Sequence, residues 1–419
     1  SPLKFLSLAN FYNLTLKDYK SAVNYYEKYL HFDDKKSVIY TILANLYAKV
    51  YSDSSLEKQI YYFEKAYELK PDDRLILHGL AFCYEKFGNR KKADIYYQKL
   101  LQNNPTETDF YNYGAFLIQS GDFKNGHRYF SHRFNTGDAN LKYPINDLER
   151  KWDFKQNLSG KTLLIHYEQG FGDTFMYCRF VPLMKKFAGK IIFLVQDDLF
   201  EIIKNSPLIS AGIDVVSDKT DLSALNYDCH MALLDCPYAL GTIADEMPFT
   251  RAYLTVPQAQ VNNYREKYIN NNRNLKVGIC TNGDKNANYN GRDIEFSAFK
   301  SIFNIEGVEF YSFSKDFETE GKIINLGGTF SNFTDTACAL KCMDFVISTD
   351  NVILNLSGAL GIETYGLFNK YPNFRWYKLS TDNVGWYESV KPLQVSENNC
   401  WKPILNEIEQ IIRQKSAQN

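Results

Sequence analysis

The chain has 419 residues, 45% of them hydrophobic and 23% charged, which predicts a globular protein of about two or three domains. Its net charge of −1 excludes the broad basic field of proteins that bind nucleic acids or anionic membranes. The eight cysteines form no CxxC pair and no Cys/His cluster, so we expect no metal site. No signal peptide and no apolar run of about 18 residues is present, so we expect a cytoplasmic protein.

Residues 1–138 repeat a pattern of paired helices. The clearest unit, Leu75–Glu107, has small, aromatic, turn and helix-stop residues at the spacing of a pair of about 34 residues: Ala81, Tyr84, Gly88, Ala93, Tyr97 and Pro105. This spacing resembles a tetratricopeptide repeat. The unit before it carries about three extra residues around Ser52–Ser55, the first unit has one extra residue in its turn, and a fourth covers Asp109–Phe134. The pattern therefore predicts a helical solenoid of four stacked pairs.

A solenoid of this kind usually binds a protein or peptide on its inner face. The alternative is that the repeats only brace the domain that follows. The aromatic side chains at these positions are mostly core residues, so we assign no individual solenoid residue to binding.

From residue 160 the pattern changes to short apolar strands that alternate with helical segments. The first series predicts the strands Thr162–His166, Ile191–Gln196, Asp214–Ser217 and Met231–Leu234. After a linker with a helix at Pro257–Arg273, a second series predicts Lys276–Cys280, Val308–Phe313, Ile323–Leu326, Phe345–Ser348 and Thr364–Phe368. We predict an α plus α/β architecture, in which two Rossmann-like domains, 139–272 and 273–419, follow the solenoid and face one cleft. The second domain ends in a helix.

Three common catalytic motifs are absent from the sequence. It contains no P-loop, no GxGxxG turn and no GxSxG nucleophile elbow. This argues against a P-loop NTPase, a dinucleotide-dependent dehydrogenase and an α/β-hydrolase. What remains is a set of polar loops at the carboxyl ends of the predicted strands, where ligands bind in open α/β sheets.

The most informative loop follows the first strand and consists of Glu168, Gln169, Gly170, Phe171, Gly172 and Asp173. Its glycines let the backbone approach a ligand, and the start of the next helix favours negative charge. Asp173 is therefore either a helix cap or a base that faces a substrate. We assign the loop to the acceptor side of the cleft, where Glu168 could orient the loop or a substrate hydroxyl.

Four later loops offer groups that could hold a diphosphate. Their candidate residues are Asn282 and Arg292; Ser312 and Lys315; Thr334, Asp335 and Thr336; and Asp350 and Asn351, with Asn355 in the helix beyond. We expect Thr334 or Asp335 to cap a helix. One lysine, one arginine, hydroxyls and helix N-termini can hold a diphosphate leaving group without a metal.

Several motifs resemble a known family. In chain order they are EQGFGD…RFVP, KVGIC.NG…R, FYSFSK, NFTDTACAL, DFVISTDN…LSGALG and FRWYK…GWYES. With the junction GDFKNGHRYFSHRF, they cover roughly residues 109–403 and resemble bacterial glycosyltransferases that follow tetratricopeptide repeats. These enzymes are relatives of the lipopolysaccharide heptosyltransferases of glycosyltransferase family 9 and have a GT-B fold.

The resemblance implies roles for the matching residues. Asp173 matches the catalytic base that takes the proton of the acceptor hydroxyl. Lys315 matches a lysine that contacts the donor phosphates, and Ser312 would support the same phosphates. Asp350 and Asn351 match the place where such enzymes hold the donor sugar or its phosphates.

Two positions depart from the family pattern D-T-x-x-x-H-L-A-G-A-L-G. Asn351 stands in place of the threonine and Asn355 in place of the histidine. Because asparagine carries no charge and shuttles no proton, the second change argues against an acid role at residue 355. It also suggests a different donor or a weakened enzyme.

The resemblance implies an inverting, metal-independent glycosyltransferase whose only small-molecule partner is a nucleotide-sugar co-substrate. The repeats favour a polypeptide acceptor, flagellin- or adhesin-like, glycosylated on Ser or Thr hydroxyls. One alternative is a heptosyltransferase-like enzyme that acts on saccharides, and another is an inactive transferase that serves as a repeat scaffold. We expect no nucleic-acid partner and no membrane span, and oligomerisation remains open.

Overall fold

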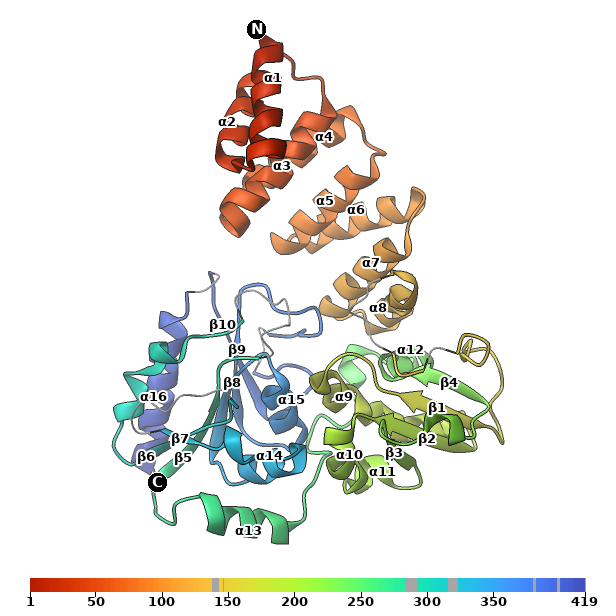
Figure 1. Ribbon diagram of the computed structural model, residues 1–419, viewed down its shortest axis with the longest axis vertical. Coiled ribbons are helices and arrows are strands. Elements are labelled where there is room, and N and C mark those ends of the chain that lie inside the picture. The colour runs from red at the N-terminus through yellow and green to blue at the C-terminus, as the bar shows by residue number, and fades with distance from the viewer. Residues whose placement is uncertain are drawn as a thin grey trace. The chain divides into compact units, whose positions relative to one another are not determined.

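The N-terminal region consists of paired helices, as the repeat spacing predicts (Figure 1). The computed structural model describes residues 1–137, 143–145, 147–283, 292–315, 323–379, 382–397 and 400–418. Within residues 1–137, four pairs follow one another: α1 Pro2–Asn10 with α2 Tyr19–Leu30, α3 Ser37–Tyr51 with α4 Leu56–Leu69, α5 Arg74–Lys86 with α6 Arg90–Gln102, and α7 Glu107–Gln119 with α8 Phe123–Phe130. The predicted helical repeats are confirmed.

Small residues let these helices approach one another. Ala81 and Ala93 of the clearest repeat are fully buried, and the turn between their helices contains Gly88 at a φ of +83°. A Cβ atom at Gly79 of α5 would lie 2.3 Å from the ring of Phe63 of α4. The close contact between these two pairs therefore requires glycine at this position.

The extra residues of the first two repeats lie at the ends of their first helices. In the first repeat, α1 continues into a π-helical segment, η1 Phe11–Leu16, whose wider turn accommodates an additional residue. In the second, the insertion forms a 3₁₀ turn, η2 Ser52–Ser55, directly before α4. Both insertions therefore leave the pairing of the helices intact.

The described chain divides into two compact units. The first unit contains Ser1–Phe116 and Tyr129–Gly137, and the second contains Leu117–Arg128 and Asp138–Asn419. Part of α8 thus belongs to the second unit, where the ring of Phe123 lies 4.6 Å from that of Tyr377 and 5.5 Å from that of Trp386. Both β-sheets belong to the second unit.

The first sheet is parallel, with the strand order β3-β2-β1-β4 in the described residues. Its strands are β1 Thr162–His166, β2 Lys190–Val195, β3 Asp214–Ser217 and β4 Cys229–Ala232. β4 ends two residues earlier than predicted because the chain turns into a 3₁₀ segment at Leu233–Asp235 and then into a helix with Pro237 in its first turn. The other three strands agree with the prediction to within one residue.

The second sheet is also parallel, with the order β10-β9-β8-β5-β6-β7 in the described residues. Its strands are β5 Leu275–Cys280, β6 Val308–Ser312, β7 Ile323–Asn325, β8 Phe345–Thr349, β9 Thr364–Phe368 and β10 Val390–Gln394. β10 was not predicted, and it contains Pro392, a residue that weakens the sequence signal of a strand. It lies at the edge of the sheet, where proline is tolerated.

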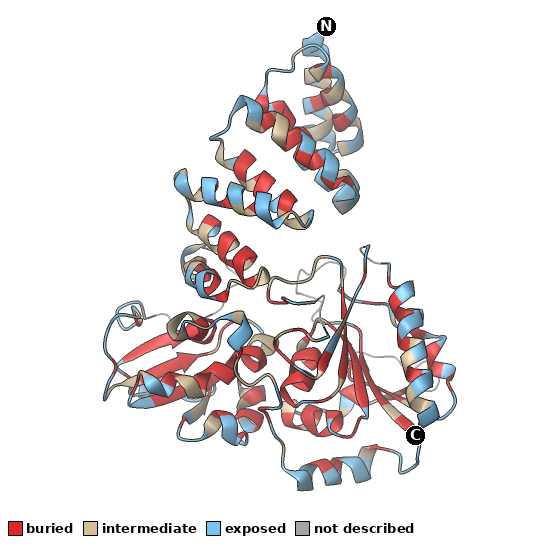
Figure 2. Ribbon diagram, turned by 180° about the vertical axis from the view of Figure 1, so that it is seen from behind, coloured by how far each residue is buried: buried red, intermediate tan, exposed pale blue. Residues whose placement is uncertain are grey.

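Helices flank both sheets, and the central strands β1, β5 and β8 are buried along most of their length (Figure 2). These helices are α9 Phe171–Tyr177, α10 Asp197–Lys204, α11 Pro207–Ser210, α12 Cys236–Leu240, α13 Gln258–Tyr268, α14 Phe333–Leu340, α15 Val352–Ala359 and α16 Lys402–Gln418. None of the helices in the described residues is long and apolar enough to span a membrane. The α plus α/β fold class is confirmed.

A fully buried arginine connects the helical layer of the first sheet to the segment around Trp386. Arg179 lies in η4 Cys178–Lys186, the 3₁₀ segment that follows α9. Its guanidinium donates hydrogen bonds to the carbonyl oxygens of Met176 at 2.9 Å and Trp386 at 2.5 Å, and to the hydroxyl of Tyr253 at 2.8 Å. It also lies over the ring of Tyr387, 4.7 Å from the centroid. Three chain segments far apart in sequence therefore meet at one side chain.

Candidate active site

The loop after β1 carries the residues predicted on the acceptor side. Glu168 is fully buried, and its Oε1 accepts a hydrogen bond from the backbone N–H of Leu234 at 3.1 Å, just past β4. Gln169 follows with a φ of +60°, a left-handed conformation that is costly for a residue other than glycine and recurs at functional sites. Glu168 therefore ties the loop to the sheet, and Gln169 turns the chain into α9.

Asp173 is the third residue of α9, whose N-cap is Gly170. Its Oδ2 accepts a hydrogen bond from the Gly170 N–H at 3.2 Å, which closes the first turn of the helix. Its Oδ1 lies 2.5 Å from Nε of Arg375 in an ion pair. The two interpretations of Asp173 are therefore compatible, because one oxygen serves the helix and the other faces a charged group.

Burial raises the pKa of Asp173 above its ordinary value. The positive charge of Arg375 and the Gly170 N–H lower this pKa, while the negative charge of Glu168 raises it further. A carboxylate with a raised pKa is a better proton acceptor than an ordinary aspartate. The position of Asp173 thus suits a general base.

Arg375, in the loop after β9, is a site residue that the sequence interpretation did not assign. The residue is only 8% exposed; it pairs with Asp173, donates to Oε1 of Gln169, and donates through Nη1 to Oδ1 of Asn373 at 2.9 Å. Its backbone carbonyl accepts from the indole N–H of Trp386 at 2.7 Å. Loops of the two sheets therefore meet at Arg375, for which the motif FRWYK was the sequence signal.

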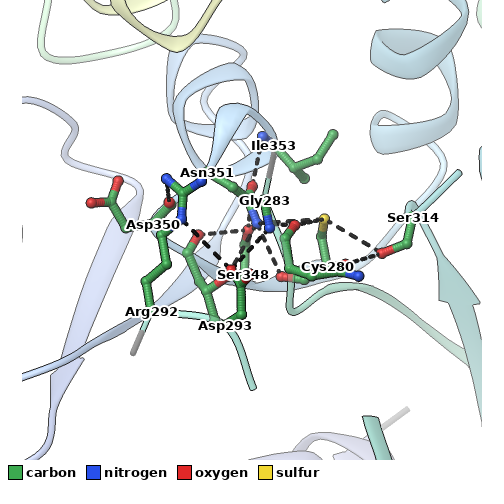
Figure 3. Close-up of polar contacts among 11 residues, drawn as sticks. Cys280, Gly283, Arg292, Asp293, Ser314, Ser348, Asp350, Asn351 and Ile353 are labelled. Atoms are coloured by element: carbon green, nitrogen blue, oxygen red, sulfur yellow. Dashed lines mark hydrogen bonds and ion pairs between the residues drawn. The ribbon is translucent and has the colours of Figure 1, made fainter. Parts of the chain in front are cut away.

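Asp350 follows β8 and supplies a second carboxyl group to this region. Its backbone carbonyl accepts a hydrogen bond from Nη1 of Arg292 at 3.1 Å (Figure 3). Burial raises the pKa of its carboxyl group, and Trp376, Arg292 and Arg375 lower it. The charge of Asp173 also raises this pKa. The two carboxylates, one from each sheet, are thus close enough to affect each other.

A pocket of about 60 Å³ opens beside Arg292 and Asp350. The strand end and loop of β9 line the rest of it, through Leu367, Phe368, Asn369, Tyr371, Pro372 and Asn373. The pocket therefore lies at the carboxyl ends of β8 and β9, where ligands bind in open α/β sheets.

Asn351 joins the ends of β5 and β8 (Figure 3). Its Oδ1 accepts from the backbone N–H groups of Ile353 at 2.8 Å and Leu354 at 3.4 Å, which caps α15. Its Nδ2 donates to the carbonyl oxygens of Cys280 and Asn282, each at 3.3 Å. The oxygen and the nitrogen of this buried side-chain amide therefore both form hydrogen bonds inside the protein. Its predicted role in binding the donor stays a prediction.

Asn351→Ala should lower the free energy of unfolding by about 2–3 kcal/mol, because a helix cap is lost and two inward-facing carbonyls lose a donor. Asn351→Thr keeps a capping oxygen and should cost about 1 kcal/mol. Urea unfolding followed by tryptophan fluorescence measures both.

The matched control for this prediction is Asn332→Ala, because Asn332 caps α14 with the same pair of contacts, to the N–H groups of Thr334 at 2.8 Å and Asp335 at 3.3 Å. This change should cost about 1 kcal/mol, as expected for a cap alone. Equal costs for Asn351→Ala and Asn332→Ala would contradict the bridging role.

Asn355 is buried between helices. Its Nδ2 donates to the carbonyl oxygen of Asn351 at 3.2 Å, and its Oδ1 accepts from the hydroxyl of Tyr387 at 3.0 Å. A Cβ atom at Gly172 of α9 would lie 3.0 Å from the same Nδ2. Asn355 thus fills the contact between α9 and α15, and Gly172 provides the room.

The remaining candidates of the second sheet differ in how accessible they are. Ser312 is fully buried at the end of β6, where its Oγ accepts from the N–H of Ser314 at 3.3 Å. Asn282 is exposed, and its Oδ1 accepts from the hydroxyl of Ser314 at 2.6 Å. Lys315 is exposed just beyond. Of these three predicted residues, Lys315 and Asn282 are therefore the ones a ligand could reach directly.

The prediction that Thr334 or Asp335 caps α14 is wrong, because Asn332 is the N-cap. Asp335 instead accepts from the N–H of Ser331 at 2.9 Å, and Thr336 donates to the carbonyl oxygen of Asn332 at 3.3 Å. Within the described residues, Thr334 Oγ1 is buried without a hydrogen-bond partner. Asparagine accepts here because its backbone is extended and its side chain reaches the first-turn amides.

Comparisons with known proteins find some that are similar to the repeats and some that are similar to the two sheets. Protein FlbA of Caulobacter vibrioides is 23% identical in an alignment of 394 residues that covers 85% of this chain and 64% of FlbA, so the chain spans less than two thirds of that relative. The ADP-heptose lipopolysaccharide heptosyltransferase II of E. coli is 10% identical, with a TM-score of 0.45, over 61% of this chain and 99% of that one. YrrB, a tetratricopeptide-repeat protein, is 19% identical, with a TM-score of 0.28, over 32% and 66%. No protein-family model matches.

The predicted resemblance to repeat proteins and to family 9 glycosyltransferases is confirmed. The fold itself is established by the helical pairs and the two parallel sheets.

Proposed function

We propose that the chain is an inverting, metal-independent protein glycosyltransferase that moves a sugar from a nucleotide sugar to Ser or Thr hydroxyls of a polypeptide. The observation that supports it best is the carboxylate of Asp173, which lies at the carboxyl edge of the first sheet with a raised pKa. The loops of the second sheet, with Arg292, Asp350 and Lys315, supply the groups for a donor diphosphate.

In this mechanism Asp173 takes the proton of the acceptor hydroxyl as that oxygen attacks C1 of the sugar. The bond from C1 to the diphosphate breaks, and the nucleoside diphosphate leaves with the electron pair. Arg292, Lys315 and the N-termini of α14 and α15 favour the negative charge that develops on it. Inversion is part of the proposal because a single displacement of this kind reverses the configuration at C1.

The surface of the repeats supports a polypeptide acceptor. Most of the exposed large hydrophobic side chains of the described residues lie in the helical pairs, among them Leu14, Phe32, Leu75, Phe82, Phe87 and Ile95. Such side chains suit contact with another polypeptide better than with a saccharide. We also place the reaction in the cytoplasm, since the cysteines are free thiols and seven of them are buried.

The burial of Asn355 bears on the scaffold alternative. Its amide is buried, with the nitrogen bonded to the carbonyl oxygen of Asn351 and the oxygen bonded to the hydroxyl of Tyr387. The change from the family's histidine is therefore accommodated by packing, and it gives no separate reason to regard the transferase unit as inactive.

The test is transfer by the purified full chain from labelled UDP-, GDP-, ADP- and CMP-sugars. Flagellin subunits, lipopolysaccharide cores or neither would be offered as acceptor, and the products would be weighed by intact-mass spectrometry. We expect one donor to label the flagellin on Ser or Thr. Labelling of glycan cores without polypeptide would favour the saccharide enzyme, and failure to bind or use every donor would favour the scaffold.

A further inference from the structure

Arg375 occupies a position that the proposed chemistry does not yet use. It comes from the loop after β9 of the second sheet, yet its guanidinium contacts Asp173 and Gln169 of the first sheet's loop. The side chains of Arg375 and Asp173 are 10% and 15% exposed, so the pair is largely removed from water. An ion pair in such surroundings is stronger than one on the surface and is less screened by salt.

The pair occupies the proposed base. Oδ2 of Asp173 accepts from the N–H of Gly170, and Oδ1 faces Arg375 at 2.5 Å. An acceptor hydroxyl must displace or share one of these contacts before Asp173 can take its proton. In this arrangement both carboxylate oxygens of Asp173 are already in contact with protein groups.

The guanidinium also contacts a residue that lines the pocket beside Arg292 and Asp350. This residue is Asn373, to which Nη1 donates at 2.9 Å. A diphosphate placed in that pocket would lie next to Arg375. Arginine binds phosphate oxygens with two parallel hydrogen bonds, as it does carboxylates, so a diphosphate can compete with Asp173 for it.

We propose that Arg375 is a positioning residue that acts through Asp173: it holds the base in the ion pair until a nucleoside diphosphate group draws the guanidinium away. The inference rests on the proposed function. Its consequence is that the base becomes available only when the donor is bound. Such coupling would order the reaction, with the donor bound before the base can accept the proton of an acceptor hydroxyl.

The groups that face Asp173 define what a test must separate. They are Arg375, which favours its charged form, and Glu168 and Asp350, whose negative charges oppose it. Asp173 opposes diphosphate binding in two ways. Its negative charge repels the diphosphate, and its ion pair with Arg375 keeps that guanidinium from binding the diphosphate. Removal of the carboxylate relieves both effects, whereas removal in a chain without Arg375 relieves only the repulsion.

The experiment is a binding cycle measured by calorimetry with ADP, UDP, GDP and CDP as probes. Asp173→Asn should bind the preferred diphosphate about 5–10-fold more tightly than the wild-type chain, within the usual range of coupling between groups. In an Arg375→Gln background the same change should alter binding by less than about twofold. Arg375→Lys keeps the positive charge but cannot form two parallel hydrogen bonds. In this background the effect of Asp173→Asn on diphosphate binding should lie between those in the wild-type and Arg375→Gln backgrounds.

Equal tightening in both backgrounds, or none in the presence of Arg375, would overturn the inference while the proposed function stands. If no diphosphate binds the wild-type chain, the proposed function fails and the inference fails with it. Arg251→Gln is the control, because Arg251 forms an exposed ion pair with Glu388 at 3.0 Å and should leave binding unchanged. Thermal unfolding of each variant checks that it is folded.

Discussion

Asp173→Asn should lower the rate of sugar transfer by about 100-fold or more, which is the scale of a lost general base. Asparagine cannot take a proton at neutral pH, but its Oδ1 can still accept the hydrogen bond from Gly170 that closes the first turn of α9. The rate is measured with a labelled donor under saturating conditions. Unchanged transfer would leave Asp173 with a structural role only.

The pH dependence of the wild-type rate of sugar transfer is a second test of the role of Asp173. Asp173 must be ionised to act, and burial raises its pKa, so the rate should fall with decreasing pH at a higher pH than an ordinary aspartate would give. Asp173→Asn should remove this acidic limb from the residual rate. A limb that survives the substitution belongs to another group.

The stability of the Asp173→Asn chain should change by less than about 1 kcal/mol at neutral pH. A carboxyl group whose pKa is raised in the folded state stabilises the fold at low pH, and this contribution is lost as pH rises through the folded pKa. Replacement by a neutral amide removes the cost of burying a charged carboxylate. It also leaves Arg375 without its ion-pair partner, and the two effects offset each other. Asp221→Asn, at an exposed 3₁₀ cap, is a control that should keep both rate and stability.

Arg179→Met should destabilise the second unit by about 3–5 kcal/mol. Methionine fills much of the same space but leaves the carbonyls of Met176 and Trp386 and the hydroxyl of Tyr253 without a donor in a fully buried setting. Arg179→Lys keeps the charge but cannot reach all three partners, so it should cost less and still be destabilising.

Denaturant unfolding can measure this cost selectively. All four tryptophans lie after residue 150, so their fluorescence reports on the second unit and not on the repeats. Arg251→Met is the matched control, because its ion pair with Glu388 links neighbouring stretches of the same segments at the surface. It should cost less than about 0.5 kcal/mol. A cost below about 1 kcal/mol for Arg179→Met would show that the contacts are dispensable.

The sequence predicts the fold well where the signal is local. Runs such as Thr162–His166 and Thr364–Phe368 are apolar and bounded by turns, and both strands lie where they were expected. The signal fails where a local rule conflicts with a position in the sheet. Pro392 weakens the sequence signal of β10, yet an edge strand tolerates it.

The candidate site is predictable only in part, for a related reason. Asp173 could be found because it follows a strand and two glycines, which are neighbours in sequence. Its partner Arg375 lies about two hundred residues away, and no spacing rule joins them. Asn351 was expected to face a donor, but whether an amide points inward or outward depends on carbonyls from another strand. Such pairings exist only once the sheet is assembled.

The contact between Gly172 and Asn355 has a consequence for how the sequence of this protein can vary. A side chain at residue 172 would meet the amide of Asn355, so a change at either position limits what the other can be. Residue 172 is next to the proposed base, and residue 355 is one helical turn from the cap of α15. Under the proposed function, substitutions that adapt the donor side to a different sugar are therefore not independent of the acceptor side. The two sides of the proposed site would have to change together.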